Sequence, residues 1–98
     1  MSEPVVTQVP EKSRYELRIE GELVGVEEYR LRDDRIVLTH TEVDTARRER
    51  GLGSMLVKAA LDDARAAGLA VIPVCPFVAS YIEGHPEYAN LLPSSEED

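Results

Sequence analysis

A glycine-rich turn ahead of the longest helical pattern constrains this chain most. The turn contains Gly51 and Gly53, and two glycines separated by one residue let the backbone approach a bound group closely. Positions 48–50, just before it, hold none of the usual side-chain caps Ser, Thr, Asp or Asn. The first N–H groups of the following helix could therefore bind an anion. The alternative is an ordinary loop-to-helix turn whose donors meet water.

Helical periodicity continues from the turn, from about Arg50 or Gly51 to Ala67, and Gly68 is expected to end the helix. Apolar residues and alanines fill most of the helix surface, so we expect it to be covered over a wide arc and to pack closely on a sheet. One narrow seam is polar and consists of Ser54, Lys58, Asp62 and Arg65.

The residues before the turn predict β-strands. Polar and apolar residues alternate over 14–20 and 23–31, and residues 35–43 form a third run, so short turns between them predict an antiparallel meander. A slip in the alternation at Glu27-Glu28 is interpreted as a β-bulge. The third strand is expected to carry four residues on one face: Ile36, Leu38, His40 and Glu42.

An apolar run follows the helix over residues 69–74 and suits a strand parallel to the third strand. Pro73 and Pro76 limit its pairing, so the sheet should part or end near Cys75. Residues 77–83 can form a short helix. The predicted fold is α+β: an antiparallel three-strand meander, a long helix, a parallel strand and a short C-terminal helix.

We expect one domain over residues 13–92, a flexible N-terminal segment over 1–12 and an acidic, disordered tail over 93–98. The formal charge of −8 and the pI near 4.7 argue against nucleic-acid or anionic-membrane partners. One cysteine cannot form an internal disulfide, and no apolar run approaches the roughly 20 residues of a membrane span. The expected location is the cytoplasm.

Three blocks of sequence carry a resemblance to a known family. Residues 48–53, Arg-Glu-Arg-Gly-Leu-Gly, match the (Gln/Arg)-x-x-Gly-x-(Gly/Ala) signature of the GCN5-related N-acetyltransferases (GNAT), between a strand and the long helix as in that family. Residues 40–43 and 73–88 are similar to the small YjdJ-like branch of the superfamily. The resemblance covers about Tyr15 to Leu92. It implies a minimal GNAT-like fold that lacks the N-terminal strand and helices shaping the acceptor pocket in larger relatives.

The resemblance implies that the co-substrate is acetyl-coenzyme A. Its pyrophosphate would lie on backbone N–H groups of the turn, beside a local concentration of arginines, and its pantetheine arm would run between the third and last strands where they part. The residues implied in binding are Glu42, Val43, Arg48, Glu49, Arg50, Gly51, Leu52, Gly53, Ser54, Cys75, Pro76, Phe77 and Tyr81. No metal is expected, and the protein is predicted to be a monomer or weak homodimer.

Several residues are candidates for catalysis. Cys75, at the implied position of the acetyl group, could be a nucleophile that takes the acetyl group, or it could simply be packed. His40 could lower the pKa of Cys75 or accept an amine proton directly, and Glu42 could be an alternative base acting through water. Tyr81 could protonate the departing coenzyme A, whereas His85 is expected to be structural.

The predicted function is an N-acetyltransferase that acts on a small-molecule or protein amine. The alternative is a coenzyme A binding or interaction module with little or no turnover.

Overall fold

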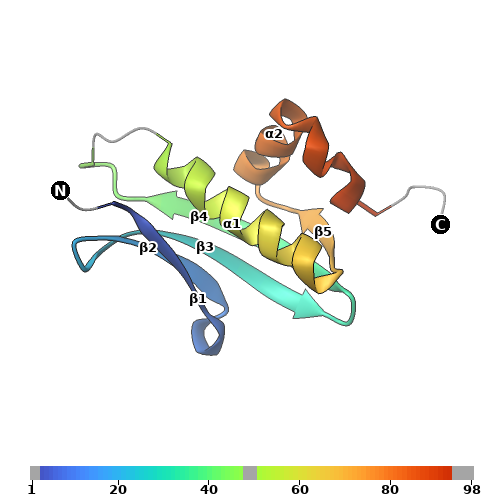
Figure 1. The fold of residues 1–98 in the computed structure, drawn as a ribbon, viewed down its shortest axis with the longest axis horizontal. Helices are drawn as coiled ribbons and strands as arrows, with labels where there is room; N and C mark the ends of the chain where they lie inside the picture. The colour runs from blue at the N-terminus through green and yellow to red at the C-terminus, as the bar shows by residue number, and fades with distance from the viewer. Residues whose placement is uncertain (1–2, 48–50, 94–98) are drawn as a thin grey trace.

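The structure is a computed structural model that describes residues 3–47 and 51–93. Five strands form one sheet in the order β1-β2-β3-β4-β5, and the long helix α1 packs across it (Figure 1). The strands are β1 (Val5–Val9), β2 (Arg14–Ile19), β3 (Glu22–Arg32), β4 (Arg35–Val43) and β5 (Ala70–Pro73). The helices are α1 (Leu52–Ala67) and α2 (Pro76–Gly84), with 3₁₀ turns η1 (Pro10–Lys12) and η2 (Pro86–Leu91).

The sheet is mixed, as predicted. β1 to β4 pair antiparallel, and β5 pairs parallel to β4 from Arg35↔Ala70 to Leu38↔Pro73. A parallel pair needs a crossover connection, and α1 provides it between β4 and β5. The predicted α+β architecture is therefore confirmed.

The N-terminal segment corrects one expectation. Residues 1–12 were predicted to be a loose lead-in, but Val5–Val9 forms β1 at the edge of the sheet, with Val5 opposite Arg18 and Val9 opposite Arg14. The meander therefore has four strands, and a strand stands ahead of those that the sequence identified. β1 buries only part of its side chains, so backbone pairing with β2 holds it and its sequence shows no clear alternation.

A β-bulge in β4 changes which side chains of this strand face α1. Tyr29 of β3 pairs with Leu38, but the preceding residue Glu28 pairs with His40, which leaves Thr39 as the extra residue of β4. A one-residue insertion reverses the alternation beyond it. The prediction that Ile36, Leu38, His40 and Glu42 share one face was therefore wrong beyond Leu38.

A second bulge adds Val24 to β3 opposite the Leu17–Arg18 step of β2. The bulge predicted in this strand at Glu27-Glu28 is displaced: the register with β4 shifts at the next step, between Glu28 and Tyr29, but the extra residue there belongs to β4. The alternation within β3 changes at Val24, and Glu27 occupies a core position.

Glycines in the left-handed conformation bound α1. Gly51, with φ of 79°, is the N-cap and Gly68, with φ of 72°, is the C-cap, as expected for residues without a Cβ. The helix turns six apolar residues to the core: Leu52, Leu56, Val57, Ala60, Leu61 and Ala64.

The polar seam of α1 holds the C-terminal segment. Asp62 accepts a hydrogen bond from the hydroxyl group of Tyr88 at 2.7 Å, and Lys58 donates to the other oxygen of Asp62 at 2.7 Å. The guanidinium of Arg65 lies 5.1 Å from the ring centre of Tyr88. The seam therefore fixes η2 against α1, where the figure shows it beside the helix (Figure 1).

Candidate functional site

The start of α1 offers backbone donors, as the sequence predicted. The first hydrogen bond in the helix runs from the N–H of Met55 to the carbonyl of Gly51 at 2.9 Å. The N–H groups of Leu52, Gly53 and Ser54 therefore have no partner from helix geometry, and no side chain caps this end. No acidic residue lies in the first turn, so the positive end of the helix dipole is not compensated there.

The sheet parts next to this helix start. Pairing between β4 and β5 ends at Leu38 and Pro73, and the N–H of Cys75 donates to the carbonyl of Leu38 at 3.0 Å before the chain enters α2. β4 continues to Val43 paired only with β3. The expected end of pairing near Cys75 is confirmed.

A cavity of about 450 Å³ lies where these features meet. It is lined by residues of β4, the glycine turn, α1 and α2: Thr41, Val43, Gly51, Leu52, Gly53, Ser54 and Phe77. A cavity with an apolar wall and a few backbone donors is typical of a small-molecule site.

Phe77 forms the apolar wall and explains one of the two glycines. A Cβ added to Gly53 would lie 3.0 Å from Cζ of the Phe77 ring, so any larger residue would force the ring to shift from its place against the helix start. Phe77 is still 44% exposed, which leaves much of this apolar side chain open to solvent or a ligand. Gly51 has a different role, because a Cβ there would meet open space and only its positive φ requires glycine.

A row of polar groups crosses the sheet behind the cavity. Tyr15, Glu27 and Thr41 lie opposite one another on β2, β3 and β4. The hydroxyl group of Thr41 donates to Oε1 of Glu27 in a short hydrogen bond and lies 3.4 Å from Sγ of Cys75. Tyr15 donates to Asp63 of α1 at 3.0 Å, which places this row on the helix side of the sheet.

Glu27 is the unusual member of this row. Its side chain is 0% exposed, and its Oε2 has no hydrogen-bond partner among the described residues. Burial raises the pKa of Glu27 to about 7, although the hydrogen bond from Thr41 and the nearby His40 favour the ionised form. A carboxyl group with such a pKa can both accept and release a proton near neutral pH.

Cys75 lies at the end of the row and is the N-cap of α2. It is 7% exposed, and its thiol touches the only polar side chain of the row that also lines the cavity, Thr41. Pro76 follows as the first residue of α2.

The structure does not bring His40 and Glu42 to Cys75. Beyond the bulge at Thr39, Thr41 turns inward and its two neighbours turn outward. The side chains of His40 and Glu42 are 53% and 71% exposed, and the two pair with each other at 3.2 Å. Their roles as bases stay predictions, and the buried Glu27 is a further candidate for the base.

The remaining predicted residues are Tyr81 and His85, which the structure describes, and three residues before α1, which it does not. Tyr81 stacks on His85 with ring centres 3.8 Å apart, and His85 bonds to the carbonyl of Tyr81 at 2.7 Å, which agrees with a structural role for His85. Burial raises the pKa of Tyr81. Arg48, Glu49 and Arg50 lie outside the described residues, so their predicted phosphate contacts stay predictions.

Sequence reasoning missed Glu27, Thr41 and Gly25. A glutamate that breaks an otherwise alternating strand was a usable signal for Glu27, but it was attributed to a bulge. Thr41 could not be identified because its inward position depends on Thr39. Gly25 lies under the start of α1, where an added Cβ would be 3.0 Å from Cδ1 of Leu56.

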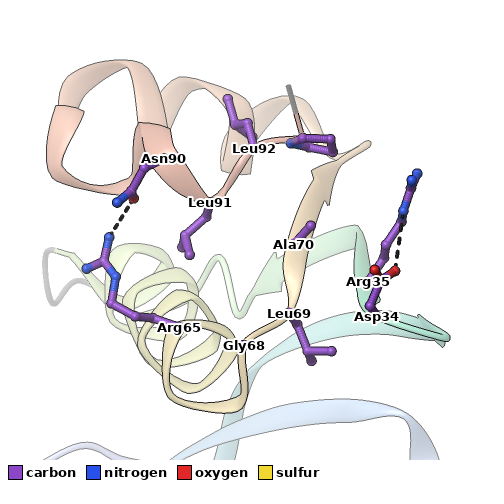
Figure 2. A pocket seen from close by; sticks show the side chains of 10 residues that line it. Asp34, Arg35, Arg65, Gly68, Leu69, Ala70, Asn90, Leu91 and Leu92 are labelled. Carbon is purple, nitrogen blue, oxygen red and sulfur yellow. Dashed lines mark hydrogen bonds and ion pairs between the residues drawn. The ribbon is translucent and has the colours of Figure 1, made fainter. Parts of the chain in front are cut away.

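A larger hollow of about 520 Å³ lies at the other end of α1, away from the glycine turn (Figure 2). Its charged groups are already paired: Arg65 donates to Oδ1 of Asn90 at 2.9 Å, and Arg35 lies 3.7 Å from Asp34. It contains none of the predicted site residues. Within residues 3–47 and 51–93, no group of three or more His, Cys, Asp or Glu side chains could hold a metal ion. No helix of that part is long and apolar enough to cross a membrane.

Comparisons with known proteins agree with this geometry. A family model described as GCN5-related N-acetyl-transferase matches residues 14–91. A GCN5-like protein from Staphylococcus aureus with a presumed N-acetyltransferase activity is 25% identical, with a TM-score of 0.71 over 96% of this chain and 92% of its own. No curated protein sequence matches the chain.

A second solved structure is similar in fold alone. The ribosomal-protein-alanine N-acetyltransferase of Brucella melitensis biovar Abortus 2308 is 18% identical, with a TM-score of 0.53 over 84% of this chain and 64% of its own. The narrower assignment to the YjdJ-like branch stays a prediction.

Proposed function

Because the chain belongs to the GCN5-related N-acetyltransferase family, we propose that it transfers an acetyl group from acetyl-coenzyme A to the amine of a small molecule or protein. The observation that carries this proposal is the cavity between the glycine turn and the parted strands. It combines helix N–H groups that have no partner within the helix, which suit a pyrophosphate, with the exposed ring of Phe77, which suits an apolar arm.

The residues present fit such a ligand. Gly51 and Gly53 leave the backbone of the turn bare, and the N–H groups of Leu52 to Ser54 would hold the pyrophosphate. The pantetheine arm would follow Val43 past Thr41 toward Cys75, where pairing between β4 and β5 has ended. The thioester would supply an activated acetyl group next to Cys75.

Two chemical routes fit this placement. In the first, the thiol of Cys75 takes the acetyl group and then passes it to the amine. In the second, the amine attacks the thioester directly and a base accepts its proton. The contact between Cys75 and Thr41 at the cavity wall favours the first route.

Acetyl-coenzyme A binding can be tested with a matched pair of glycine variants. Gly51 and Gly21 have nearly equal positive φ angles, 79° and 81°, and at both an added Cβ meets nothing within 4 Å. Gly51→Ala and Gly21→Ala should therefore lose similar stability, about 1–2 kcal/mol. Only Gly51→Ala should also lose affinity, because the strained backbone moves the N–H donors of the turn.

The measurement is a thermal melt of each protein with and without acetyl-coenzyme A. Saturation at 100 times the Kd adds about 2.7 kcal/mol to the stability of the wild type, and Gly21→Ala should show the same gain. Equal gains in both variants would contradict the assignment of the turn. No gain in the wild type would contradict binding altogether. Release of free thiol with an added amine then separates an enzyme from a binding module.

A further inference from the structure

Glu27 is a buried acid with a hydrogen-bonded connection to the candidate site. It is fully buried, it lies one side chain away from the cavity, and one of its carboxylate oxygens has no partner in the described part of the chain. A buried carboxyl without full hydrogen bonding is costly for the fold. Such a group calls for an explanation beyond packing.

The direction of the hydrogen bonds links Glu27 to the thiol. Thr41 has a single hydroxyl proton, and it donates that proton to Oε1 of Glu27. With its proton used, the hydroxyl oxygen of Thr41 can only accept a further hydrogen bond, and Sγ of Cys75 lies 3.4 Å away and can donate it. Thiol, hydroxyl and carboxylate thus form a row along which the thiol proton can pass to the carboxylate and return.

We propose that Cys75 and Glu27 share one proton through the hydroxyl group of Thr41, with Glu27 as a positioning residue that takes up the thiol proton when Cys75 reacts. The inference rests on the proposed function for its reaction partner, the thioester of acetyl-coenzyme A. The shared proton itself is a property of the free protein.

The reaction step balances without another reagent. The S–H bond of Cys75 breaks, its proton goes to Oγ1 of Thr41, and the hydroxyl proton of Thr41 goes to Glu27. Sγ forms a bond to the acetyl carbon, the bond between that carbon and the sulfur of coenzyme A breaks, and the leaving thiolate takes the proton back. The site ends with acetylated Cys75, ionised Glu27 and protonated coenzyme A.

The burial of Glu27 makes the exchange feasible. Because burial raises the pKa of Glu27 from 4.5 to about 7, this carboxylate accepts a proton about 300-fold more readily than an ordinary one.

Among the described residues, two charged groups act on Glu27. His40 of β4 favours the ionised form of Glu27 and Glu28 of β3 opposes it, and Tyr15 lies opposite in β2. The buried residues of α1 are apolar, although its Asp63 accepts a hydrogen bond from Tyr15, and α2 buries Val78 and Ile82. The pH response of the pair should therefore depend mainly on its own two groups.

The test is the rate at which iodoacetamide alkylates the free protein between pH 5.5 and 9, followed by intact mass. Cys75 is the only cysteine, so each adduct reports on this thiol. The wild-type rate should rise about tenfold per pH unit up to about pH 7 and then level off, because ionised Glu27 opposes a second negative charge on the thiol and the remaining thiolate is the one whose proton lies on Glu27.

Variants separate proton sharing from packing. Glu27→Gln should match the wild type at pH 6 but continue to rise, so that it reacts up to about tenfold faster at pH 8. The neighbouring Glu28→Gln should keep the wild-type profile. Thr41→Val should move the levelling to higher pH, because Glu27 loses a hydrogen bond that favours ionisation, whereas Thr41→Ser should retain it.

A wild-type profile that climbs tenfold per pH unit from 6 to 8.5 would overturn proton sharing, even if the Glu27 variant failed to fold. Superimposed wild-type and Glu27→Gln profiles would do the same. The alkylation test contains no acetyl-coenzyme A. If the wild-type profile levels off but the protein does not bind acetyl-coenzyme A, proton sharing stands and only the proposed function is contradicted.

Discussion

Glu27 combines complete burial with an ionisable side chain, and this should be visible in stability as well as in reactivity. Its pKa is about 7 in the folded chain against an ordinary value of 4.5. The folded state therefore holds a proton that the unfolded state has lost between these pH values. Stability should fall as the pH rises through this window, by roughly 3 kcal/mol if Glu27 alone is considered.

Replacing Glu27 with glutamine should remove this loss. We expect Glu27→Gln to gain about 2–3 kcal/mol relative to the wild type when the pH is raised from 5 to 8. The packing difference between wild type and Glu27→Gln is the same at both pH values, so it cancels when the change in stability from pH 5 to 8 is compared. Urea unfolding at both values measures it, with Glu28→Gln as the exposed control. A constant difference between wild type and Glu27→Gln would show that Glu27 ionises with the same pKa in the folded and the unfolded chain, which would contradict a raised pKa in the fold.

At the scale of elements, the candidate site depends on how closely the start of α1 approaches the end of the sheet. Gly25 of β3 permits this approach. A Cβ at this position would lie 3.0 Å from Leu56 of α1 and 3.2 Å from the carbonyl oxygen of Glu42 in β4. The cavity therefore depends on a glycine that does not line it.

Gly25→Ala should destabilise the fold by about 1–3 kcal/mol, because the backbone of β4 cannot give way as a flexible side chain can. Gly84→Ala is the matched control, since an added Cβ there meets nothing within 4 Å and no positive φ is involved. That control should be as stable as the wild type or more stable by up to about 1 kcal/mol. Equal midpoints of urea unfolding for both variants would contradict a close approach at Gly25.

Across the whole molecule, carboxyl groups in opposite environments set the response to pH. Glu16 accepts from Arg14 and Arg18, and these contacts, that with Arg14 above all, lower its pKa. The hydrogen bond from Lys58, and next that from Tyr88, lower the pKa of Asp62. Groups with a lowered pKa stabilise the fold above about pH 4.5, and this stabilisation is lost as the pH falls through their folded pKa values.

Together with Glu27, these groups predict a stability maximum near pH 5. Stability should fall toward lower pH as Glu16 and Asp62 are protonated, and it should fall from pH 5 to 7 as Glu27 ionises. The pI of 4.7 lies close to this maximum, so repulsion between charges is also smallest there. Urea midpoints between pH 3 and 9 test this. A steady rise from pH 4 to 8 would contradict it.

The sequence by itself determined the elements that depend on local chemistry. Gly51 and Gly68 bound α1 because the ability of glycine to adopt positive φ without strain is a local property of the residue type. The apolar run of β5 and the prolines around Cys75 likewise predicted a short parallel strand and the parting of the sheet, since burial and a missing N–H act wherever the strand lies.

Tertiary structure alone decided which side chains meet at the site. Thr39 is a bulge only because of its register with β3, and this one residue turns Thr41 toward Cys75 and His40 away from it. A glutamate is usually exposed, so its residue type does not predict that Glu27 is buried. Glu27 is buried because β2, β4 and other distant segments surround it. β1 is held by pairing with β2. Each of these features depends on contacts between distant segments, which periodicity within one segment does not encode.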